Sequence, residues 1–231
     1  MKRILLKLSG EALAGQKGHG FDEGIVRRVG GEILSLRKEG VEVAIVIGGG
    51  NFWRGRTGNE IDRTKSDQIG MLATIMNAIY VSDIFRSLGM MTSVLTPFQC
   101  GSFTKLFSKD RANKYFSKGI VIFFAGGTGH PYFSTDTGAV LRAVEIEADM
   151  LLLAKSIDGV YDSDPKDNPD AKKYDTLSIG EVVEKGLKVV DLTASVLAME
   201  NKLPMRVFGL DEANGIINAV LGDFHGTEIT V

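Results

Sequence analysis

The sequence predicts an α/β fold, a single-domain three-layer αβα sandwich around a central and mostly parallel sheet. Two observations support this prediction. Several segments are nearly continuous runs of apolar residues, as is typical of strands that are buried on both faces of a parallel sheet. Amphipathic segments of helical length alternate with these runs, and such alternation predicts helices on both sides of the sheet.

The elements follow in chain order. Five strands are expected at residues 3–8, 41–47, 90–96, 119–125 and 149–154. The helices between them are expected at residues 22–39, 66–88, 104–116 and 137–148. Later segments predict helices near 178–185 and 193–201, a strand at PMRVFG, a helix from Asp211 and a last strand at TEITV. The stretch 162–175 has two prolines and many Asp and Lys residues, so we expect a surface excursion there.

Composition excludes several classes of protein. The chain is 44% hydrophobic and 24% charged with a net charge of -2, which lacks the basic excess typical of nucleic-acid binding. No apolar run approaches the roughly 20 residues that span a bilayer. The single Cys100 excludes a disulfide framework, and His19, His130 and His225 show no zinc-ligand spacing. We therefore expect a cytoplasmic protein without nucleic-acid or membrane partners.

Three turns rich in small residues follow predicted strands, at residues 7–12, 47–55 and 125–136. In an open α/β sheet, ligands bind beyond the carboxyl ends of the strands, where these turns would meet. Glycines let backbone N–H groups face an anion. The P-loop and the Gly-x-Gly-x-x-Gly fingerprints are both missing. The sequence therefore predicts a phosphate site that several loops build together.

Two cations are candidates for that site. Lys7 ends the first strand inside an apolar run, where it could stabilise charge on a transferring phosphoryl group. The alternative is a strand-end lysine that extends to water. Arg54 follows the glycines 48–50 and could bind a second phosphate, or it could be a solvated loop residue.

Polar side chains at two helix starts are further candidates. Asp67 could accept hydrogen bonds from ribose hydroxyls, but Ser66 and Asp67 could equally cap the helix that follows. The loop 128–136 presents hydroxyls around glycines, and its Asp136 could also be only a helix cap. After the fifth strand, Tyr161 could offer a flat surface to a purine, or the segment could be a hairpin with a polar tip.

Read together, the motifs resemble those of the bacterial uridylate (UMP) kinases in the amino acid kinase superfamily. They are KLSGEAL, VIGGGNFWRG, SDQIGMLATIMN, GGTGHPYFSTD, EIEADMLLLAKSIDGVYDSDP, KVVDLTA and LPMRVFGLDE…GTEITV, spread over nearly the whole chain. The resemblance implies one amino acid kinase-like domain over residues 1–231. It places the acceptor, UMP, mainly in the N-terminal part and the ATP nucleoside mainly in the C-terminal part.

The resemblance also implies the reaction and its residues. It implies transfer of the γ-phosphoryl group of ATP to UMP, with Mg²⁺ as cofactor and no dedicated protein cage for the ion. The implied catalytic residues are Lys7, Arg54 and Asp136. The implied ATP-binding residues are Lys7, Ser9, Gly10, Gly50, Arg54, Lys155, Tyr161 and Asp164. The implied UMP-binding residues are Gly49, Asp67, Thr128, Gly129, His130, Pro131, Tyr132, Phe133, Ser134 and Thr135.

Regulation and assembly follow from the resemblance alone. The loop Gly18, His19, Gly20, Phe21 and Asp22 matches the segment linked to GTP activation, although His19 and Phe21 differ from the commoner residues. UTP inhibition and a homohexamer are further implications. The chain also reads Lys155-Ser156 where many members have Thr-Lys. Apolar residues of the long helix could contribute to association or only to the core; they are Ile69, Leu72, Ile75, Met76, Ile79 and Leu88.

Two other functions fit the same fold. An acyl-phosphate-forming kinase of the carbamate, glutamate or aspartate type would need groups that recognise a carboxylate and an amine. A non-catalytic binder of nucleotides or oxyanions would not need Lys7 beside the glycine turns.

Overall fold

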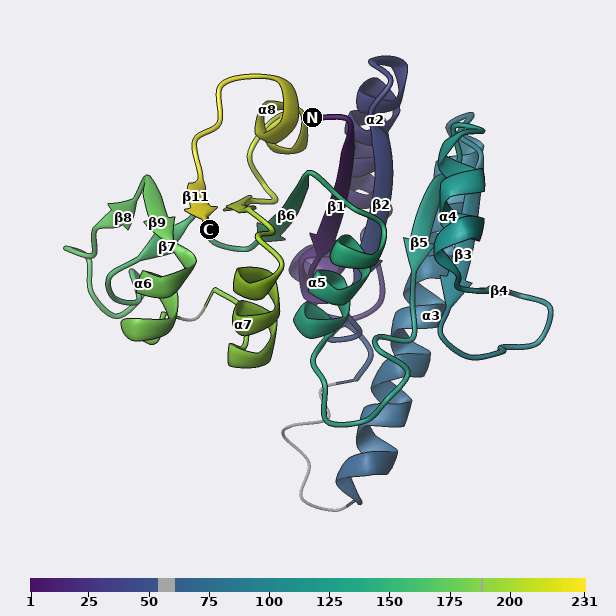
Figure 1. Ribbon diagram of the computed structural model, residues 1–231, viewed down its shortest axis with the longest axis horizontal. Helices are drawn as coiled ribbons and strands as arrows, with labels where there is room; N and C mark the ends of the chain where they lie inside the picture. The colour runs from purple at the N-terminus through teal and green to yellow at the C-terminus, as the bar shows by residue number, and fades with distance from the viewer. Residues whose placement is uncertain (54–60, 188) are drawn as a thin grey trace.

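The computed structural model of the chain describes residues 1–53, 61–187 and 189–231 (Figure 1). Its nine-stranded sheet has the order β4-β3-β5-β2-β1-β6-β10-β11-β9. Within the described residues, neighbouring strands of this sheet are parallel except for the antiparallel pair β10–β11. This confirms the predicted mostly parallel α/β architecture.

The strands have short bounds that match the apolar runs. They are β1 (Arg3–Leu8), β2 (Glu42–Ile47), β3 (Thr92–Thr96), β4 (Lys105–Leu106), β5 (Val121–Phe124), β6 (Met150–Lys155), β9 (Thr176–Ser178), β10 (Met205–Gly209) and β11 (Thr227–Thr230). Two more strands, β7 (Val160–Tyr161) and β8 (Lys173–Tyr174), form a separate antiparallel pair. The stretch between them is the predicted surface excursion, and we refer to residues 158–174 as the β7–β8 arm.

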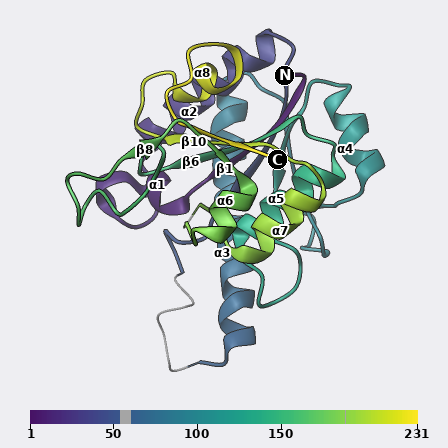
Figure 2. The same ribbon diagram turned by 60° about the vertical axis from the view of Figure 1, so that its left-hand side comes forward.

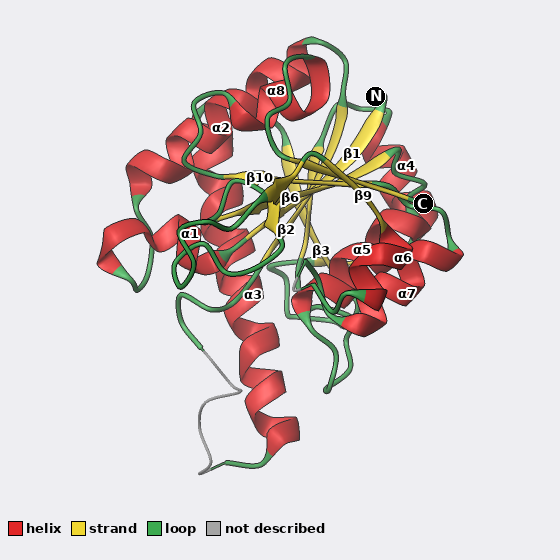
Figure 3. Cartoon of the chain, turned by 90° about the vertical axis from the view of Figure 1, so that its left-hand side faces the viewer, coloured by secondary structure: helices red, strands yellow, loops and turns green. Residues whose placement is uncertain are grey.

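Helices cover both faces of the sheet (Figures 2 and 3). One face carries α2 (Glu23–Lys38), α3 (Arg63–Ser87) and α8 (Gly215–Leu221), whose apolar side chains join one core cluster. The other face carries α4 (Lys109–Phe116), α5 (Thr135–Glu145), α6 (Ile179–Glu184) and α7 (Leu192–Glu200), which pack into a second cluster. A short helix, α1 (Gly10–Ala14), and the 3₁₀ turn η1 (Gly15–Lys17) follow β1.

Strand alternation decides which face each side chain of β1 reaches. Ile4, Leu6 and Leu8 join the cluster on the α2–α3–α8 face, and Leu5 joins the cluster on the α5–α7 face. Because side chains alternate along a strand, Lys7 falls on the same face as Leu5. The sequence pattern thus directs Lys7 toward α5 at the carboxyl end of the strand.

Two helix starts differ from the prediction, and both corrections matter for the site. Helix α3 begins at Arg63, where the side chain of Asp62 accepts from Lys65 N at 3.2 Å. The expectation that Ser66 and Asp67 cap this helix is therefore wrong. Helix α5 begins at Thr135 and is capped by the side chain of Ser134. Asp136 is therefore not the cap either, and neither carboxylate is needed to start its helix.

The helix predicted from residue 104 begins later than expected. Lys105 and Leu106 pair with β3 instead, and α4 starts after Ser108, whose hydroxyl accepts from Arg111 N at 3.2 Å. Thr104 is buried, and its hydroxyl lies 2.7 Å from that of Thr96. The serine cap and the strand pairing thus outweigh the apolar periodicity that suggested a longer helix.

Helix α3 is unusually long and apolar. Among the described residues, it is the one helix with the length and composition to cross a membrane, and 44% of its most apolar window is buried. Its inner face, which includes Ile75 and Phe85, packs on β2, β3 and β5. Its outer face exposes Ile69, Leu72, Met76 and Ile79. The N-terminal half of α3 extends past the strand ends (Figure 1).

Candidate active site

A pocket of about 660 Å³ lies at the carboxyl edge of the strands. Its walls come from the ends of β1, β2 and β6, the first half of α3, the loop before α5, and the segment from α6 to α7. The predicted site residues that line it are Lys7, Gly49, Gly50, Asp67, Thr128, His130, Phe133, Ser134, Thr135, Asp136 and Lys155. Three segments that are far apart in the sequence therefore meet as the strand-end argument predicts.

An ion pair stands at the centre of the pocket. Lys7 Nζ lies 2.7 Å from Asp136 Oδ1, and the two side chains are only 13% and 20% exposed. Within the described residues this buried oxygen accepts no hydrogen bond, and the charge of Lys7 is its partner. The sheet supplies Lys7 and the first turn of α5 supplies Asp136. The pair therefore links the sheet to α5 within the cavity lining.

Lys155 joins this pair from the neighbouring strand. Lys7 is in register with Leu153 of β6, so Lys155 extends from the same face of the sheet, one strand across and slightly further along. Its ammonium donates to the carbonyl of Val189. Burial lowers the pKa of Lys155, the Asp136 carboxylate opposes this shift, and the charge of Lys7 adds to it. Within this cluster two lysines outnumber one carboxylate, whereas the described cavity lining as a whole balances Lys7, Arg63 and Lys155 against Asp67, Asp136 and Asp191.

The turn after β2 forms the floor of the pocket, and packing explains its glycines. A Cβ on Gly49 would lie 3.0 Å from both Gly70 O and Ala73 Cβ of α3. A Cβ on Gly50 would lie 2.8 Å from Glu11 Oε1. A side chain at Gly49 would therefore require the backbone of α3 to shift, whereas at Gly50 the flexible Glu11 side chain would have to move.

Gly10 belongs to the same close packing, but it lies beneath the pocket. A Cβ on Gly10 would lie 2.3 Å from Gly48 O. Ser9 sits at the N-cap position of α1, where its side chain makes no capping hydrogen bond. Neither residue lines the pocket, so their predicted contacts with ATP are not part of this cavity.

Asp67 ties α3 to the loop that precedes α5. Its Oδ2 accepts from Tyr132 N at 2.7 Å and from Arg63 Nε at 2.8 Å. Tyr132 has a φ of 71°, which is strained for a residue with a side chain. The Thr128 hydroxyl accepts from His130 N at 3.2 Å within the same loop. The Asp67 carboxylate therefore holds this loop in place at the cavity lining.

Not every residue of the predicted UMP loop reaches the cavity. Gly129, Pro131 and Tyr132 do not line it, and the side chain of Tyr132 is 65% exposed. A Cβ on Gly129 would lie 3.0 Å from Pro97, so this glycine serves the packing of the loop. The cavity is lined by the first and last parts of the loop.

Sequence reasoning missed Asp191, which joins two helix starts at the pocket. Its carboxylate accepts from the hydroxyls of Ser134 and Thr137, the latter at 3.0 Å, and it caps α7 through Ala194 N at 3.1 Å. The N-termini of α5 and α7 therefore converge on the cavity. An aspartate before an amphipathic helix signals a cap but not its distant partners. Trp53, Arg63 and Thr74 also line the cavity.

A model of the amino acid kinase family matches residues 2–209. The chain belongs to the amino acid kinase family.

Solved structures in this family are similar over nearly the whole chain. The UMP kinase from Bacillus anthracis is 39% identical with a TM-score of 0.95, and the match covers 99% of this chain and 96% of that one. The UMP kinase from Ureaplasma parvum is 35% identical with a TM-score of 0.93, covering 100% and 99%. The uridylate kinase from Archaeoglobus fulgidus is 28% identical with a TM-score of 0.76, covering 100% of both chains.

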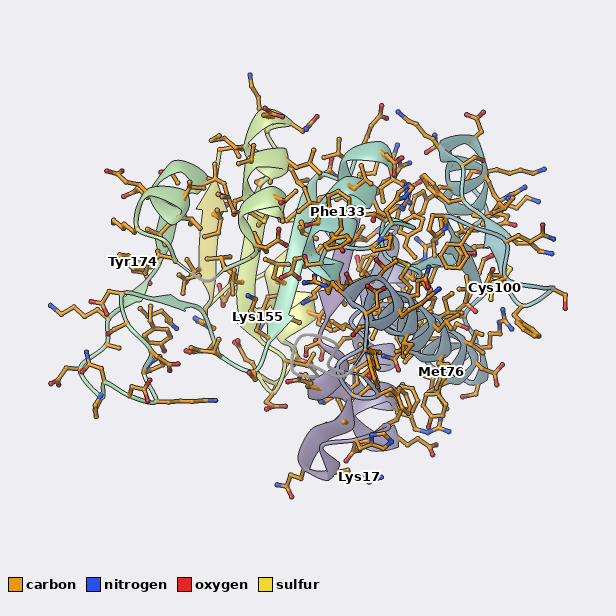
Figure 4. All side chains as sticks on the ribbon, turned by 90° about the horizontal axis from the view of Figure 1, so that it is seen from below. Lys17, Met76, Cys100, Phe133, Lys155 and Tyr174 are labelled. Atoms are coloured by element: carbon orange, nitrogen blue, oxygen red, sulfur yellow. The ribbon has the colours of Figure 1, made fainter. Side chains whose placement is uncertain are left out.

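Two residues expected to contact ATP lie on the β7–β8 arm, away from the cavity lining. The hydroxyl of Tyr161 donates to Asp158 Oδ1 at 2.7 Å, and Asp164 Oδ1 accepts from Lys166 N at 2.9 Å. In Figure 4, Tyr174 of this arm lies to the left of Lys155, and Phe133 lies to the right of Lys155. Arg54 lies outside the described residues, so its role stays a prediction.

The loop 18–22 packs against the outer side of the pocket floor and does not line the cavity. The rings of His19 and Phe52 meet edge to face at 5.1 Å, and Phe21 stacks on Tyr80 of α3 at 3.9 Å. Asp22 caps α2 through Ile25 N at 3.2 Å. This loop therefore touches the floor and α3, the two elements that it would have to influence in any regulatory role.

The described residues contain no group of three or more His, Cys, Asp or Glu side chains that could hold a metal. One carboxylate nevertheless fits a Mg²⁺ ion that is bound to substrate phosphates. Asp136 Oδ1 is buried and lies 2.7 Å from Lys7 Nζ, and it accepts no hydrogen bond from the described residues. Magnesium in phosphoryl-transfer sites is held by substrate phosphates and one or two carboxylates.

Proposed function

We propose that this chain is a UMP kinase, which transfers the γ-phosphoryl group of ATP to UMP and yields UDP and ADP for pyrimidine nucleotide biosynthesis. The observation that carries the proposal is the Lys7–Asp136–Lys155 cluster beside the glycine floor. The solved structures that resemble this chain over nearly its whole length are UMP kinases. The cluster supplies positive charge where two phosphate chains would meet.

Phosphoryl transfer to UMP requires little acid–base catalysis from the protein. The acceptor is a phosphate oxygen that is already deprotonated at neutral pH, so the transfer needs no general base. Catalysis then rests on alignment and on stabilisation of charge in the transition state. Lys7 and Lys155 are suited to bind the transferring group, and Asp136 is suited to orient the ammonium of Lys7.

The remaining walls are suited to bind the acceptor. The N-terminus of α5 offers backbone N–H groups near Ser134 and Thr135, which favours a phosphate there. Asp67 has a second carboxylate oxygen for ribose hydroxyls. Phe133 and His130 in the cavity lining are suited to the base.

Mg²⁺ belongs to the proposal as a cofactor that arrives with ATP. Asp136 is the residue that would help to hold it, together with the phosphates. When bound, the ion would neutralise phosphate charge during transfer. Lys7, which already pairs with Asp136, would keep that carboxylate turned toward the phosphates.

Several finer features complete the proposal. They are one amino acid kinase-like domain over residues 1–231, activation by GTP at residues 18–22, inhibition by UTP, a homohexamer and a cytoplasmic location. Support for the GTP role is the contact of this loop with the floor and α3. Support for association is the exposed apolar row on α3, formed by Ile69, Leu72, Met76 and Ile79.

One assay separates the proposal from its alternatives. Purified protein with ATP and Mg²⁺ is offered UMP, CMP, dUMP, AMP, carbamate or glutamate, with and without GTP and UTP. We expect ADP release and UDP formation with UMP. Hydroxamate formation from an amino acid or carbamate in the presence of hydroxylamine would indicate an acyl-phosphate kinase. Tight binding of ATP and UMP without UDP would indicate a non-catalytic binder. The solved UMP kinases favour neither alternative.

A further inference from the structure

Two buried asparagines lie directly behind the pocket floor. Asn51, the residue after Gly50, is 1% exposed, and Asn77 of α3 is 0% exposed. Neither side chain lines the cavity, and neither belongs to the charged cluster. A buried amide needs partners for both of its N–H groups and its oxygen, so this pair raises the question of what it holds.

The two amides bind each other reciprocally. Asn77 Nδ2 donates to Asn51 Oδ1 at 2.7 Å, and Asn51 Nδ2 donates to Asn77 Oδ1 at 3.0 Å. Each Nδ2 also donates to a backbone carbonyl: Asn77 to Gly48 O at 2.7 Å, and Asn51 to Gly20 O at 2.8 Å. Only an NH₂ group can face a carbonyl in this way, so both amide orientations are fixed by the backbone they bind.

The hydrogen bond from Asn77 to Gly48 O fixes the orientation of the whole Gly48–Gly49 peptide unit. A trans peptide unit is planar, and its carbonyl and the next N–H point in opposite directions. By holding Gly48 O toward α3, Asn77 directs the N–H of Gly49 away from α3. Among the described residues, the N–H groups of Gly49 and Gly50 donate to no protein acceptor. Both glycines line the cavity, so these donors are available to an anion there.

We propose that Asn77, paired with Asn51, is a positioning residue for phosphoryl transfer, because it fixes the Gly48–Gly49 peptide so that the Gly49 N–H meets a bound phosphate oxygen. This inference rests on the proposed function. Fixed donors stabilise charge without reorganisation during the reaction, whereas a peptide free to rotate would lose that advantage.

The decisive variant is Asn77→Asp, which keeps the shape and removes the donor. As a carboxylate, the new side chain faces the carbonyl of Gly48 and the oxygen of Asn51, so it repels both. As a neutral carboxylic acid, it can donate to Gly48 O again. Burial and these acceptors raise the pKa of a carboxyl group at this position. Lower pH should therefore restore the hydrogen bond from residue 77 to Gly48 O.

We expect kcat of Asn77→Asp to be about tenfold or more below wild type at pH 8, with a smaller change in the KM for UMP. The ratio of variant to wild type should recover to within about threefold at pH 5.5. Taking this ratio at each pH cancels the titration of the substrates. Asn77→Leu cannot donate at any pH, so its ratio should stay low throughout.

Two controls separate positioning from stability. Asn51→Asp also loses two bonds from a buried Nδ2, but it keeps the bond from Asn77 to Gly48 O, so its loss of kcat should be clearly smaller. Ala78→Gly destabilises α3 by about 1 kcal/mol without touching the cavity, and its kcat should match wild type. Circular dichroism checks that each variant is folded at the assay temperature.

Several results would overturn the inference. They are a wild-type kcat for Asn77→Asp, equal pH-independent losses in Asn77→Asp and Asn77→Leu, or a loss in Asn51→Asp as large as in Asn77→Asp. If Asn77→Asp folds only at low pH, it is prepared there and assayed immediately after a jump to pH 8, where the same drop is expected. A wild-type protein that forms no UDP would instead overturn the proposed function.

Discussion

The strand-end pocket and the β7–β8 arm both carry residues that the sequence predicts to contact ATP, but they hold their charges differently. In the pocket, the Lys7–Asp136 ion pair is mostly buried between the sheet and α5. In the arm, Lys173 Nζ lies 2.9 Å from Asp158 Oδ2, with side chains 28% and 52% exposed. Coulomb interactions weaken with exposure, so the pocket charges act strongly on a ligand and the arm charges act weakly.

The arm is instead suited to adapt to a ligand. Burial would raise the pKa of Asp158, but hydrogen bonds from Tyr161 and Lys173 outweigh this and lower it. These bonds stay within the arm, and they leave the Tyr161 ring free to contact a flat base. From this contrast we predict that changes in the pocket act mainly on rate and that changes in the arm act mainly on ATP affinity.

The strongest test of this division is Lys7→Ala. We expect kcat to fall about 10²-fold or more, with binding of UMP largely kept, because charge stabilisation in the transition state is lost. Steady-state kinetics and calorimetry with UMP measure the two effects. Lys109→Ala is the matched control, since it breaks a surface ion pair with Glu147 at 2.6 Å. Near wild-type turnover of Lys7→Ala would remove this lysine from the mechanism.

Lys155 offers a test through pH. Because burial lowers its pKa, Lys155 loses its proton at a lower pH than an ordinary lysine, and kcat/KM should fall on the alkaline side. Lys155→Arg stays charged, so its alkaline limb should move to higher pH. Lys155→Ala should lower kcat/KM about tenfold at neutral pH. An unchanged alkaline limb in Lys155→Arg would assign that limb to another group.

Asp67 in α3 and Asp62, the N-cap residue that precedes this helix, form a matched pair for mutation. Asp67→Ala should raise the KM for UMP about tenfold, since it would lose the proposed ribose contact and release the loop at Tyr132. Asp62→Ala removes only the helix cap, at a cost of about 1 kcal/mol, and should lower Tm by about 2–4 °C with an unchanged KM. Equal KM values in both variants would contradict the assignment of Asp67.

Much of this site follows from the sequence, because strand edges and glycines are local signals. Lys7, the floor glycines and the loop 128–136 were all predictable from their place at the ends of apolar runs. Lys155 follows once β1 and β6 are known to be neighbours. The positions of these residues depend on the alternation of side chains along each strand and on the edge where the strands end. Both can be inferred from short sequence patterns.

The rest depends on contacts between distant segments. Asp191 lies 57 residues from Ser134, and its local pattern signals only a helix cap. Asn77 reads as a polar interruption in an apolar helix, and its partner in the floor is 26 residues away. The helix starts were misplaced because Asp62 and Ser108 compete with other good caps nearby. A sequence pattern does not show which of several neighbouring cap residues starts the helix.

The arm predicts a smaller effect on ATP. Tyr161→Ala should raise the KM for ATP about fivefold, because a base would lose its stacking surface, and leave kcat nearly unchanged. Tyr161→Phe loses only the bond to Asp158 and should stay within about twofold of wild type. A fall in kcat of Tyr161→Ala as large as the fall expected for Lys7→Ala would contradict the contrast between the arm and the pocket.

The smallest effect concerns a buried charge that belongs to neither region. Glu32 of α2 is 5% exposed and accepts from Ile216 N at 2.9 Å at the start of α8. Burial raises the pKa of Glu32 above its ordinary value, although the backbone N–H groups of Ile216 and Ile217 oppose this. Since the folded-state pKa is the higher one, this group's contribution to stability is present at low pH and is lost as pH rises through that pKa.

Glu32→Gln removes this titration and keeps an oxygen for Ile216 N. Its Tm relative to wild type should therefore increase by about 2 °C or more between pH 4 and pH 8, while kcat and both KM values stay at wild type. Thermal melts across this pH range measure the difference. A Tm difference that does not change with pH would show that Glu32 does not titrate as its burial requires. A change in kcat would show that burial outside the pocket also affects the reaction, and the division between the two regions would be too simple.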